Sequence, residues 1–310
     1  MRRGASGLNL LLAIDKPAGM SSHDVVDHVR RALGERRVGH GGTLDPAATG
    51  VLVVGVGQGT RLMGMLTADT KGYVARISFG AQTNTDDAEG EVIARADVPP
   101  EVRDASFARS MLRSLEGERL QVPPAFSAIS VGGVRSYTRA RAGESVELEP
   151  RHIEVLSASL LGVDLEGGVF WDCAFEVSKG TYVRALARDI GTGVGSAAHL
   201  CRLCRTSSGG VTLGSCVSLE QVRELGAGRI REVALDPVRA LGFPVHEVDD
   251  SALRRVSAGQ AITPGEPVAS GECRSMVCGN RLLGVWEGRG GMLVPKANFP
   301  VGIEGVTFVA

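Results

Sequence analysis

One short segment, residues 38–50, constrains this chain more than any other. It contains four glycines and a single acidic residue, Asp45, and the apolar run Val51–Val54 follows it at once. Glycine lets a backbone turn tightly or approach a ligand closely, and Pro46 stiffens the chain just after the carboxylate. The apolar run is typical of a buried strand. We therefore expect a loop, braced by a core strand, that holds Asp45 as a candidate catalytic group. The alternative is that Asp45 has no catalytic role and only caps a turn, as aspartate before proline often does.

The composition indicates a globular protein with room for one large domain and one small one. The chain has 310 residues, of which 43% are hydrophobic, and no apolar run reaches the length of a membrane-spanning helix. The N-terminus has arginines but no apolar stretch that ends in a small-residue cleavage site, so we expect a cytoplasmic protein without a secretory signal. Six cysteines without a regular framework fit reduced thiols.

The net charge does not by itself indicate a nucleic-acid partner. It is -1 with a pI of about 6.6, whereas phosphate-binding domains usually carry a basic excess. Arginines do gather locally, and each group fits either a phosphate-binding face or an ordinary solvated one. The groups are Arg30 and Arg31 with Arg36 and Arg37; Arg135, Arg139 and Arg141; and Arg202 with Arg205.

Hydrophobic periodicity predicts both strands and helices. Strands are expected at residues 8–14, 73–79 and 169–177, and helices at about 21–34, at 106–115 and from Ser218 onward. Residues 178–191 are typical of a glycine turn followed by a helix that ends at Gly191. We expect a linker at residues 236–244, and the glycine-punctuated segment 245–310 predicts a small all-β unit.

Three segments suggest a cofactor or a metal but lack the pattern that it requires. Glycines at positions 55, 57 and 59 suggest a dinucleotide-binding turn, but position 60 is threonine where that motif needs glycine. Cys201 and Cys204 form a C-x-x-C pair near His199, without a second ligand pair at a spacing suited to zinc. The acidic turn Thr83–Gly90 lacks the ligand spacing of a calcium loop, so we expect it to be structural. The sequence thus predicts neither a cofactor nor a metal.

Two long motifs stand in the order found in one enzyme family. The signature loop of the TruB family of tRNA pseudouridine synthases closely resembles residues 39–50, Gly-His-Gly-Gly-Thr-Leu-Asp-Pro-Ala-Ala-Thr-Gly, and the segment before that loop resembles Ile14–Ser22. The resemblance continues through Lys71–Tyr73, Lys179–Arg184 and His199–Arg205, and so covers most of the chain. It implies isomerisation of uridine to pseudouridine in the T-loop of tRNA, at uridine 55.

The same resemblance implies a fold and a domain plan. The expected fold is α+β, with a mixed, largely antiparallel central sheet that is flanked by helices. The expected catalytic domain spans residues 1–240, with an RNA-clamping insertion at about 120–150, and a small β-rich, PUA-like RNA-binding domain spans 245–310. The enzyme is expected to act as a monomer on the T-loop and acceptor arm of tRNA, without an obligate protein partner or a membrane.

Roles for individual residues follow from the resemblance as well. Asp45 is expected to act as the nucleophile, or as the base that opens a glycal route, with Tyr73 beside it and Arg184 paired with its carboxylate. His40 is expected to fill the stack that a flipped uridine leaves or to brace the loop, and a core or capping histidine is the alternative. Further contacts are expected from Lys16 to the substrate, from Tyr182 and Leu203 to the uracil, and from Arg135, Arg139, Arg141 and Arg202 to the RNA.

Two other functions fit the same residues. A guide-RNA-dependent pseudouridine synthase of the dyskerin type shares the signature loop, although the expected insertion favours the stand-alone enzyme. An RNA-folding or RNA-binding protein whose benefit does not depend on Asp45 is the alternative from outside the enzymes.

Overall fold

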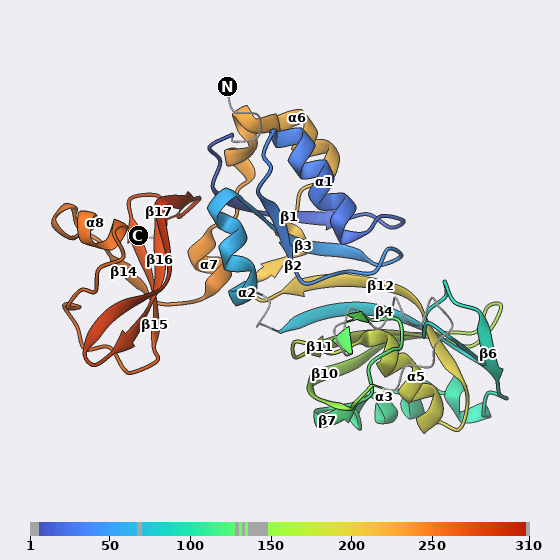
Figure 1. Cartoon of the computed structure of the whole chain (residues 1–310). Coiled ribbons are helices and arrows are strands. Elements are labelled where there is room, and N and C mark those ends of the chain that lie inside the picture. Colours follow the sequence, from blue (N-terminus) through green and yellow to red (C-terminus); the bar gives the residue numbers. More distant parts are fainter. Residues whose placement is uncertain (1–5, 67–69, 128–129, 132–133, 136–147, 308–310) are drawn as a thin grey trace. The chain divides into compact units, whose positions relative to one another are not determined.

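The structure is a computed structural model that describes residues 6–66, 70–127, 130–131, 134–135 and 148–307 (Figure 1). The chain divides into two compact units. Unit 1 combines two separate stretches, residues 1–69 and 207–310, and unit 2 is the continuous stretch 70–206. Within the described residues, no helix has both the length and the apolar character needed to cross a membrane.

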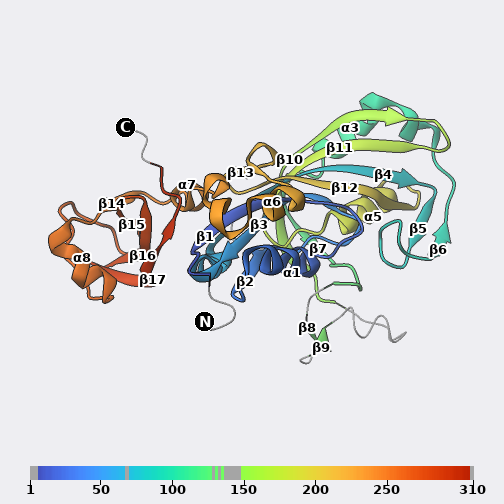
Figure 2. The same cartoon turned by 90° about the horizontal axis from the view of Figure 1, so that it is seen from above.

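Helix α1 (Ser22–Leu33) shows how local sequence sets the first part of unit 1. Its N-terminus has a capping box, in which Ser21 accepts a hydrogen bond from the Asp24 amide and the Asp24 carboxylate accepts one from the Ser21 amide. Its C-terminus is Gly34, which adopts the left-handed conformation at φ +61°. The expected helix at residues 21–34 is therefore confirmed, and its apolar face packs beside α6 (Leu219–Arg229; Figure 2).

Strand β1 (Leu10–Lys16) stands at one end of its sheet and is buried on both faces from Leu10 to Ile14. It pairs antiparallel with β3 (Thr49–Val56), which also pairs with β2 (Val38–Gly41). Leu10, Leu12 and Ile14 belong to one hydrophobic cluster with α1 and α6, whereas Leu11 and Ala13 belong to a second cluster that includes residues of the C-terminal segment. The expected strands at 8–14 and 51–54 are confirmed.

The glycines that follow β3 serve close backbone packing. A Cβ atom at Gly57 would lie 2.1 Å from the Leu8 carbonyl oxygen, and one at Gly59 would lie 2.3 Å from that of Leu10. Gly57 also has φ +59°, a conformation that favours glycine. These residues begin the short helices η1 (Gly57–Leu62) and α2 (Met63–Leu66). Close packing against the backbone of residues 8–10 thus explains why these positions are glycine, without a bound nucleotide.

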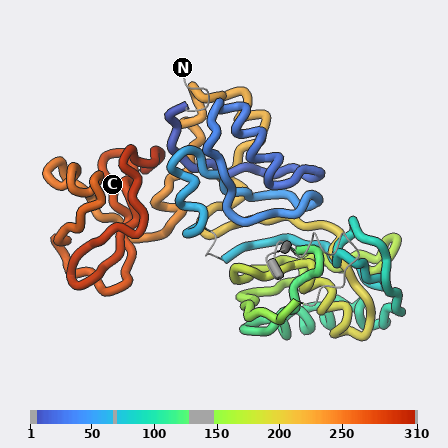
Figure 3. Tube along the Cα trace, in the orientation of Figure 1, coloured from blue at the N-terminus to red at the C-terminus, as the bar shows by residue number. Residues whose placement is uncertain are grey.

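The second stretch of unit 1 returns to the first and then forms a sheet of its own. Figure 3 shows the orange trace beside the blue one, and the Leu235 amide donates to the Leu11 carbonyl at 2.9 Å. The four-stranded sheet has the order β14-β15-β16-β17. Its strands are β14 (Val245–Glu247), β15 (Cys273–Cys278), β16 (Arg281–Arg289) and β17 (Met292–Glu304).

Two expectations for this second stretch are wrong in part. Residues 236–244 are not only a linker, because they contain helix α7 (Pro237–Leu241), which Asp236 caps and left-handed Gly242 ends. Segment 245–310 is not all β, because helix α8 (Asp250–Ser257) follows its first strand. The shorter elements between β12 and α7 are β13 (Val211–Thr212), η3 (Leu213–Ser215) and η4 (Ile230–Val233).

Unit 2 is built on strands in the order β12-β4-β11-β10-β7. Alternate residues of β4, from Tyr73 to Phe79, are buried, and Trp171 on β11 is fully buried, with its ring centroid 4.7 Å from that of Phe79. The alternation expected at residues 73–79 and 169–177 is therefore confirmed. The strands are β4 (Lys71–Phe79), β7 (Gly117–Gln121), β10 (Arg151–Asp164), β11 (Phe170–Val177) and β12 (Ala198–Ser208).

Helix α5 (Val183–Gly193) packs against β4, and helix α3 (Ala105–Arg113) packs against β10. Helix α5 continues two residues beyond its expected end at Gly191, where a Cβ atom would lie 2.5 Å from the Ala198 amide nitrogen. Gly191 therefore allows the backbone of Ala198 to pack closely against α5, and it does not end the helix. The remaining elements are β5 (Ala81–Thr83), β6 (Val92–Arg95), η2 (Pro100–Arg103), β8 (Ser130–Val131) and β9 (Val134–Arg135).

The fold is α+β, as expected. Strands β1 and β2 pair antiparallel with β3, and β4, β11, β10 and β7 pair antiparallel with one another in that order, whereas β14 and β15 are parallel. The expected boundary between residues 240 and 245 remains a prediction. The division into two units does not test it, since residues 207–310 stay together in unit 1 with residues 1–69.

Candidate active site

The Asp45 loop of unit 1 is held on both sides of its carboxylate. On one side, the Ser22 hydroxyl accepts from the Leu44 amide at 2.9 Å and donates to the Leu44 carbonyl at 3.0 Å. On the other side, the Pro46 carbonyl accepts from Lys16 Nζ at 3.1 Å and from the Gly19 amide at 2.9 Å. Asp45 itself is half-buried between these two anchors. Both neighbours of the candidate catalytic residue are thereby fixed in place.

Lys16 is the more unusual of the two anchors. The residue is fully buried, and its ammonium also donates to the carbonyls of Pro17 at 2.8 Å and Met20 at 2.6 Å. Together with Pro46, three backbone carbonyls of the protein itself thus accept from this ammonium. The structure thus gives Lys16 a role inside the protein, in which it ties the end of β1 to the loop. A contact with substrate stays a prediction.

Ser22 is a site residue that the sequence did not reveal. Ser21 caps α1, whereas Ser22 is buried against Leu44. The aspartate three residues after Ser21 marks that serine as the cap, but nothing in the sequence indicates that Ser22 contacts Leu44. His40 lies on β2, opposite Val54 of β3, and is half-buried.

Arg184 of unit 2 is buried in the first turn of α5, with 5% of its surface exposed. Its guanidinium donates to the carbonyls of Thr85 at 2.8 Å and Phe126 at 2.9 Å. The Asp87 carboxylate lies 3.5 Å from the same group. An arginine at the start of a helix is usually exposed, so this burial sets Arg184 apart from a surface cation.

The turn that receives Arg184 is internally bonded. The Thr83 hydroxyl donates to the Asp87 carbonyl and the Thr85 hydroxyl to the Asp87 carboxylate, each at 2.6 Å. Among the residues that the structure describes, no group of histidine, cysteine and acidic side chains could hold a metal ion. We expected this turn to be structural, and its contacts support Arg184.

Tyr73 and Tyr182 lie at two different positions in unit 2. Tyr73 is buried, on β4 opposite Phe175 of β11. Tyr182 is half-buried just before α5, where the Gln121 side chain accepts from its amide at 2.9 Å and donates to its carbonyl at 3.1 Å. Gln121 is buried and was missed by sequence reasoning, because it stands 61 residues before the backbone that it holds.

The expected RNA-contacting arginines have different outcomes. Arg202 is exposed on β12, whereas Arg205 is buried, so the pair does not form one solvated face. Arg135 belongs to β9, and Arg139 and Arg141 lie outside the described residues. The C-x-x-C pair lies on β12 with free thiols.

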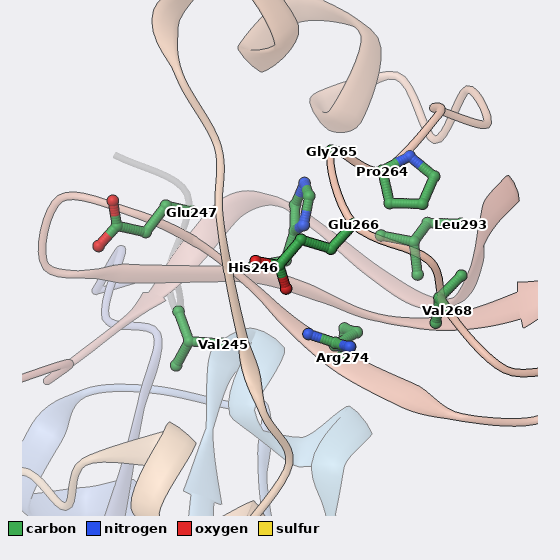
Figure 4. A pocket seen from close by; sticks show the side chains of 9 residues that line it. All are labelled: Val245, His246, Glu247, Pro264, Gly265, Glu266, Val268, Arg274 and Leu293. Atoms are coloured by element: carbon green, nitrogen blue, oxygen red, sulfur yellow. The ribbon is translucent and has the colours of Figure 1, made fainter.

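A pocket occurs elsewhere in unit 1, against the C-terminal sheet (Figure 4). Its polar side chains come from β14, β15 and the loop between α8 and β15, and burial with the nearby Arg274 guanidinium lowers the pKa of His246. Arg274 pairs with Glu272 at 2.6 Å. The lining residues are Val245, His246, Glu247, Pro264, Gly265, Glu266, Val268, Arg274 and Leu293, none of which belongs to the Asp45 loop.

Comparison with solved structures defines the class of this fold. The chain is similar to the archaeal box H/ACA sRNP Nop10-Cbf5 complex, with a TM-score of 0.67 and 23% identity, over 92% of this chain and 83% of that one. A Cbf5-Nop10-Gar1 complex matches with a TM-score of 0.67 and 22% identity over 95% of this chain. The fold is therefore that of a pseudouridine synthase.

Comparison of sequences defines the family. Residues 30–183 match the model of the TruB family pseudouridylate synthase N-terminal domain. A tRNA pseudouridine synthase B of Thermobifida fusca is 43% identical over 93% of this chain and 98% of its own length. One of Rhodococcus jostii is 44% identical over 82% of each chain. The chain belongs to the TruB family of pseudouridine synthases.

Proposed function

We propose that this pseudouridine synthase isomerises uridine 55 in the T-loop of tRNA and that Asp45 is its nucleophile. The relatives carry the name tRNA pseudouridine synthase B, which supports tRNA as the substrate. One observation supports Asp45: its two neighbours are fixed by buried anchors, Leu44 by Ser22 and Pro46 by Lys16. Fixing a nucleophile in the attacking geometry removes an entropic cost from the reaction.

The reaction needs a nucleophile and proton transfer. The bond from N1 to C1′ breaks, the base turns, and a bond from C5 to C1′ forms, while C5 loses a proton and N1 gains one. In this proposal Asp45 attacks C1′ or C6 or opens a glycal route, and Tyr73 holds the ring and removes the C5 proton. Arg184 pairs with the Asp45 carboxylate. The target base is first flipped out of its loop, at a cost of a few kcal/mol.

RNA recognition completes the proposal. Tyr182 and Leu203 line the uracil pocket, His40 fills the vacated stack, and exposed arginines such as Arg202 contact phosphates. Residues 245–310 act as a PUA-like RNA-binding domain, and the enzyme works in the cytoplasm as a monomer. Loop shape supplies much of the selectivity, as is usual for structured RNA.

Replacement of Asp45 by asparagine tests the nucleophile. Asp45→Asn keeps the size of the side chain and removes its charge, so we expect tRNA to bind as before while no pseudouridine forms. Binding is measured by filter retention and pseudouridine by chemical mapping of the tRNA. Asp97→Asn is the matched control, because Asp97 is exposed in a loop and its loss should leave turnover intact. Substantial turnover by Asp45→Asn would refute the assignment.

Incubation of the purified protein with bare tRNA tests the substrate. We expect one modified position, in the T-loop, without any added RNA or protein. A requirement for a second RNA would instead identify a guided enzyme. Restoration of tRNA function in cells by Asp45→Asn would identify an RNA-folding role that does not depend on catalysis.

A further inference from the structure

Two consecutive aspartates of unit 2 pair with two arginines on one helix. Asp87 lies 3.5 Å from Arg184, and Asp86 lies 2.9 Å from Arg188. The two arginines are four residues apart on α5, so they occupy the same face, one turn from each other. The turn Thr83–Asp87 is thus attached to α5 at two successive points. Only the first of these involves the proposed catalytic machinery.

The backbone at Asp86 makes this double attachment feasible. Consecutive residues of an extended chain point to opposite sides, so two adjacent carboxylates would not normally reach one helix. Asp86 has φ +59° and is the one non-glycine residue with positive φ in the described part of the chain. Aspartate tolerates this left-handed conformation better than most residues. The local reversal turns both carboxylates toward α5.

Asp86 also connects the turn to the sheet. The Leu200 amide on β12 donates to the Asp86 carbonyl at 3.0 Å, and the Asp86 amide donates to the Thr83 carbonyl at 3.2 Å. One residue therefore links β12 through its backbone and α5 through its side chain. Because Thr85 and Asp87 in the same turn contact Arg184, a shift of the turn along α5 would displace the partners of that guanidinium.

The Asp86–Arg188 pair is largely removed from water. Asp86 is 5% exposed, and Arg188 also donates to the Val122 carbonyl at 2.8 Å and lies 2.9 Å from Asp189. Burial raises the pKa of Asp86, against the opposing effect of Arg188. An ion pair in such surroundings adds little net stability compared with apolar residues, while the contact at 2.9 Å holds the Asp86 and Arg188 side chains at a defined separation. The pair is thus better suited to alignment than to stabilisation.

We propose that Asp86 and Arg188 are a positioning pair, which aligns α5 on the turn Thr83–Asp87 and so holds Arg184 in its working orientation. The inference rests on the proposed catalytic role of Arg184. Neither member of the pair touches substrate. Removal of the pair should therefore lower the rate of the chemical step and leave tRNA binding unchanged.

The central experiment removes both charges at once with Asp86→Asn and Arg188→Met. The double variant leaves no buried charge unpaired, and asparagine tolerates the left-handed backbone, so we expect a melting temperature close to that of the wild type. We expect kcat to fall about tenfold and KM for tRNA to stay within about twofold, because small misplacements of a catalytic group mainly slow the chemistry. A purely structural role predicts instead that the double variant has a lower melting temperature and that the folded protein keeps the wild-type kcat.

A matched control and a second variant complete the test. Arg76→Met with Asp172→Asn and Asp164→Asn removes the other ion pairs of unit 2 in which Arg76 takes part, leaves no partner charge behind, and should leave kcat unchanged. If the double variant does not fold, Asp86→Asn alone serves, since it keeps the shape of the side chain and an acceptor for Arg188. We then expect kcat to fall about threefold at constant KM.

A readout that does not depend on activity separates the two proposals. The side-chain NMR signals of Arg184, assigned with Arg184→Lys, should show hindered rotation in the wild type and averaging in the double variant. If the wild type forms no pseudouridine, but its Arg184 signals show hindered rotation that is lost in the double variant, the proposed function is wrong and the positioning pair is supported. A double variant with wild-type kcat, or with unchanged Arg184 signals, would overturn the positioning pair.

Discussion

The internal role of Lys16 leads to a quantitative prediction. Lys16→Met keeps an unbranched apolar stem of similar length and removes the ammonium that donates to the carbonyls of Pro17, Met20 and Pro46. Each hydrogen bond from a charged donor contributes about 1.5–3 kcal/mol, and the cost of keeping the charge out of water offsets part of the sum. We expect unit 1 to lose about 3 kcal/mol of stability, and its melting temperature to fall by about 6–12 °C.

The assay is thermal and urea denaturation of the variant beside the wild type, with single-turnover formation of pseudouridine as a second measurement. Lys296→Met is the control, because the Lys296 ammonium is half-exposed and pairs with Glu287 at 3.2 Å. Surface pairs of this kind contribute at most about 1 kcal/mol. A Lys16→Met protein that melts with the wild type would refute the reasoning, since the three carbonyls would then need no partner from Lys16.

Three further predictions concern single residues. Gly59→Ala should cost about 1–3 kcal/mol in urea denaturation, because its Cβ would meet the Leu10 carbonyl at 2.3 Å, whereas Gly64→Ala, with open space around it, should be neutral; equal effects would contradict the packing argument. Tyr73→Phe should lose activity by about 100-fold in single-turnover assays while its melting temperature is kept, and wild-type turnover would remove the proton-transfer role. Hydrogen bonds with Cys201 and with the Ala81 carbonyl raise the pKa of His199 above 6.5. The protonated His199 therefore contributes fully to stability below pH 6.5, and this contribution is lost as pH rises through the folded-state pKa. NMR titration should show a lower His199 pKa in Cys201→Ala, and an unchanged pKa would refute that cause.

The sequence predicted the elements that local chemistry decides. Helix α1 begins at a serine with an aspartate three residues later and ends at a glycine, and both signals act within a few residues. The strand alternation at residues 73–79 reflects one buried face. Helix α7 was missed because proline at its start and glycine at its end also mark turns, and five residues are too few to show a helical period.

The contacts that hold the candidate site were harder to predict than its candidate members. Motif resemblance identified Asp45 and Arg184 as candidates, but their supports come from distant positions: Ser22 stands 22 residues before Leu44, and Thr85 stands 99 residues before Arg184. Periodicity describes which face of an element is buried and does not say which element covers it. The positive φ at Asp86 was likewise hidden, since aspartate is common in turns of either hand.

The divided course of unit 1 has a consequence for the order in which the protein can fold during synthesis. Residues 70–206 have all of their own unit's partners once the ribosome has made them, and they can fold while translation continues. The first 69 residues cannot complete their core at that stage, because the cluster on one face of β1 also includes residues between 211 and 306, which are made later. Until those residues emerge, the cluster that contains Leu11 and Ala13 lacks part of its apolar partners. The strand that bears Lys16 is thus finished late, although it is made early.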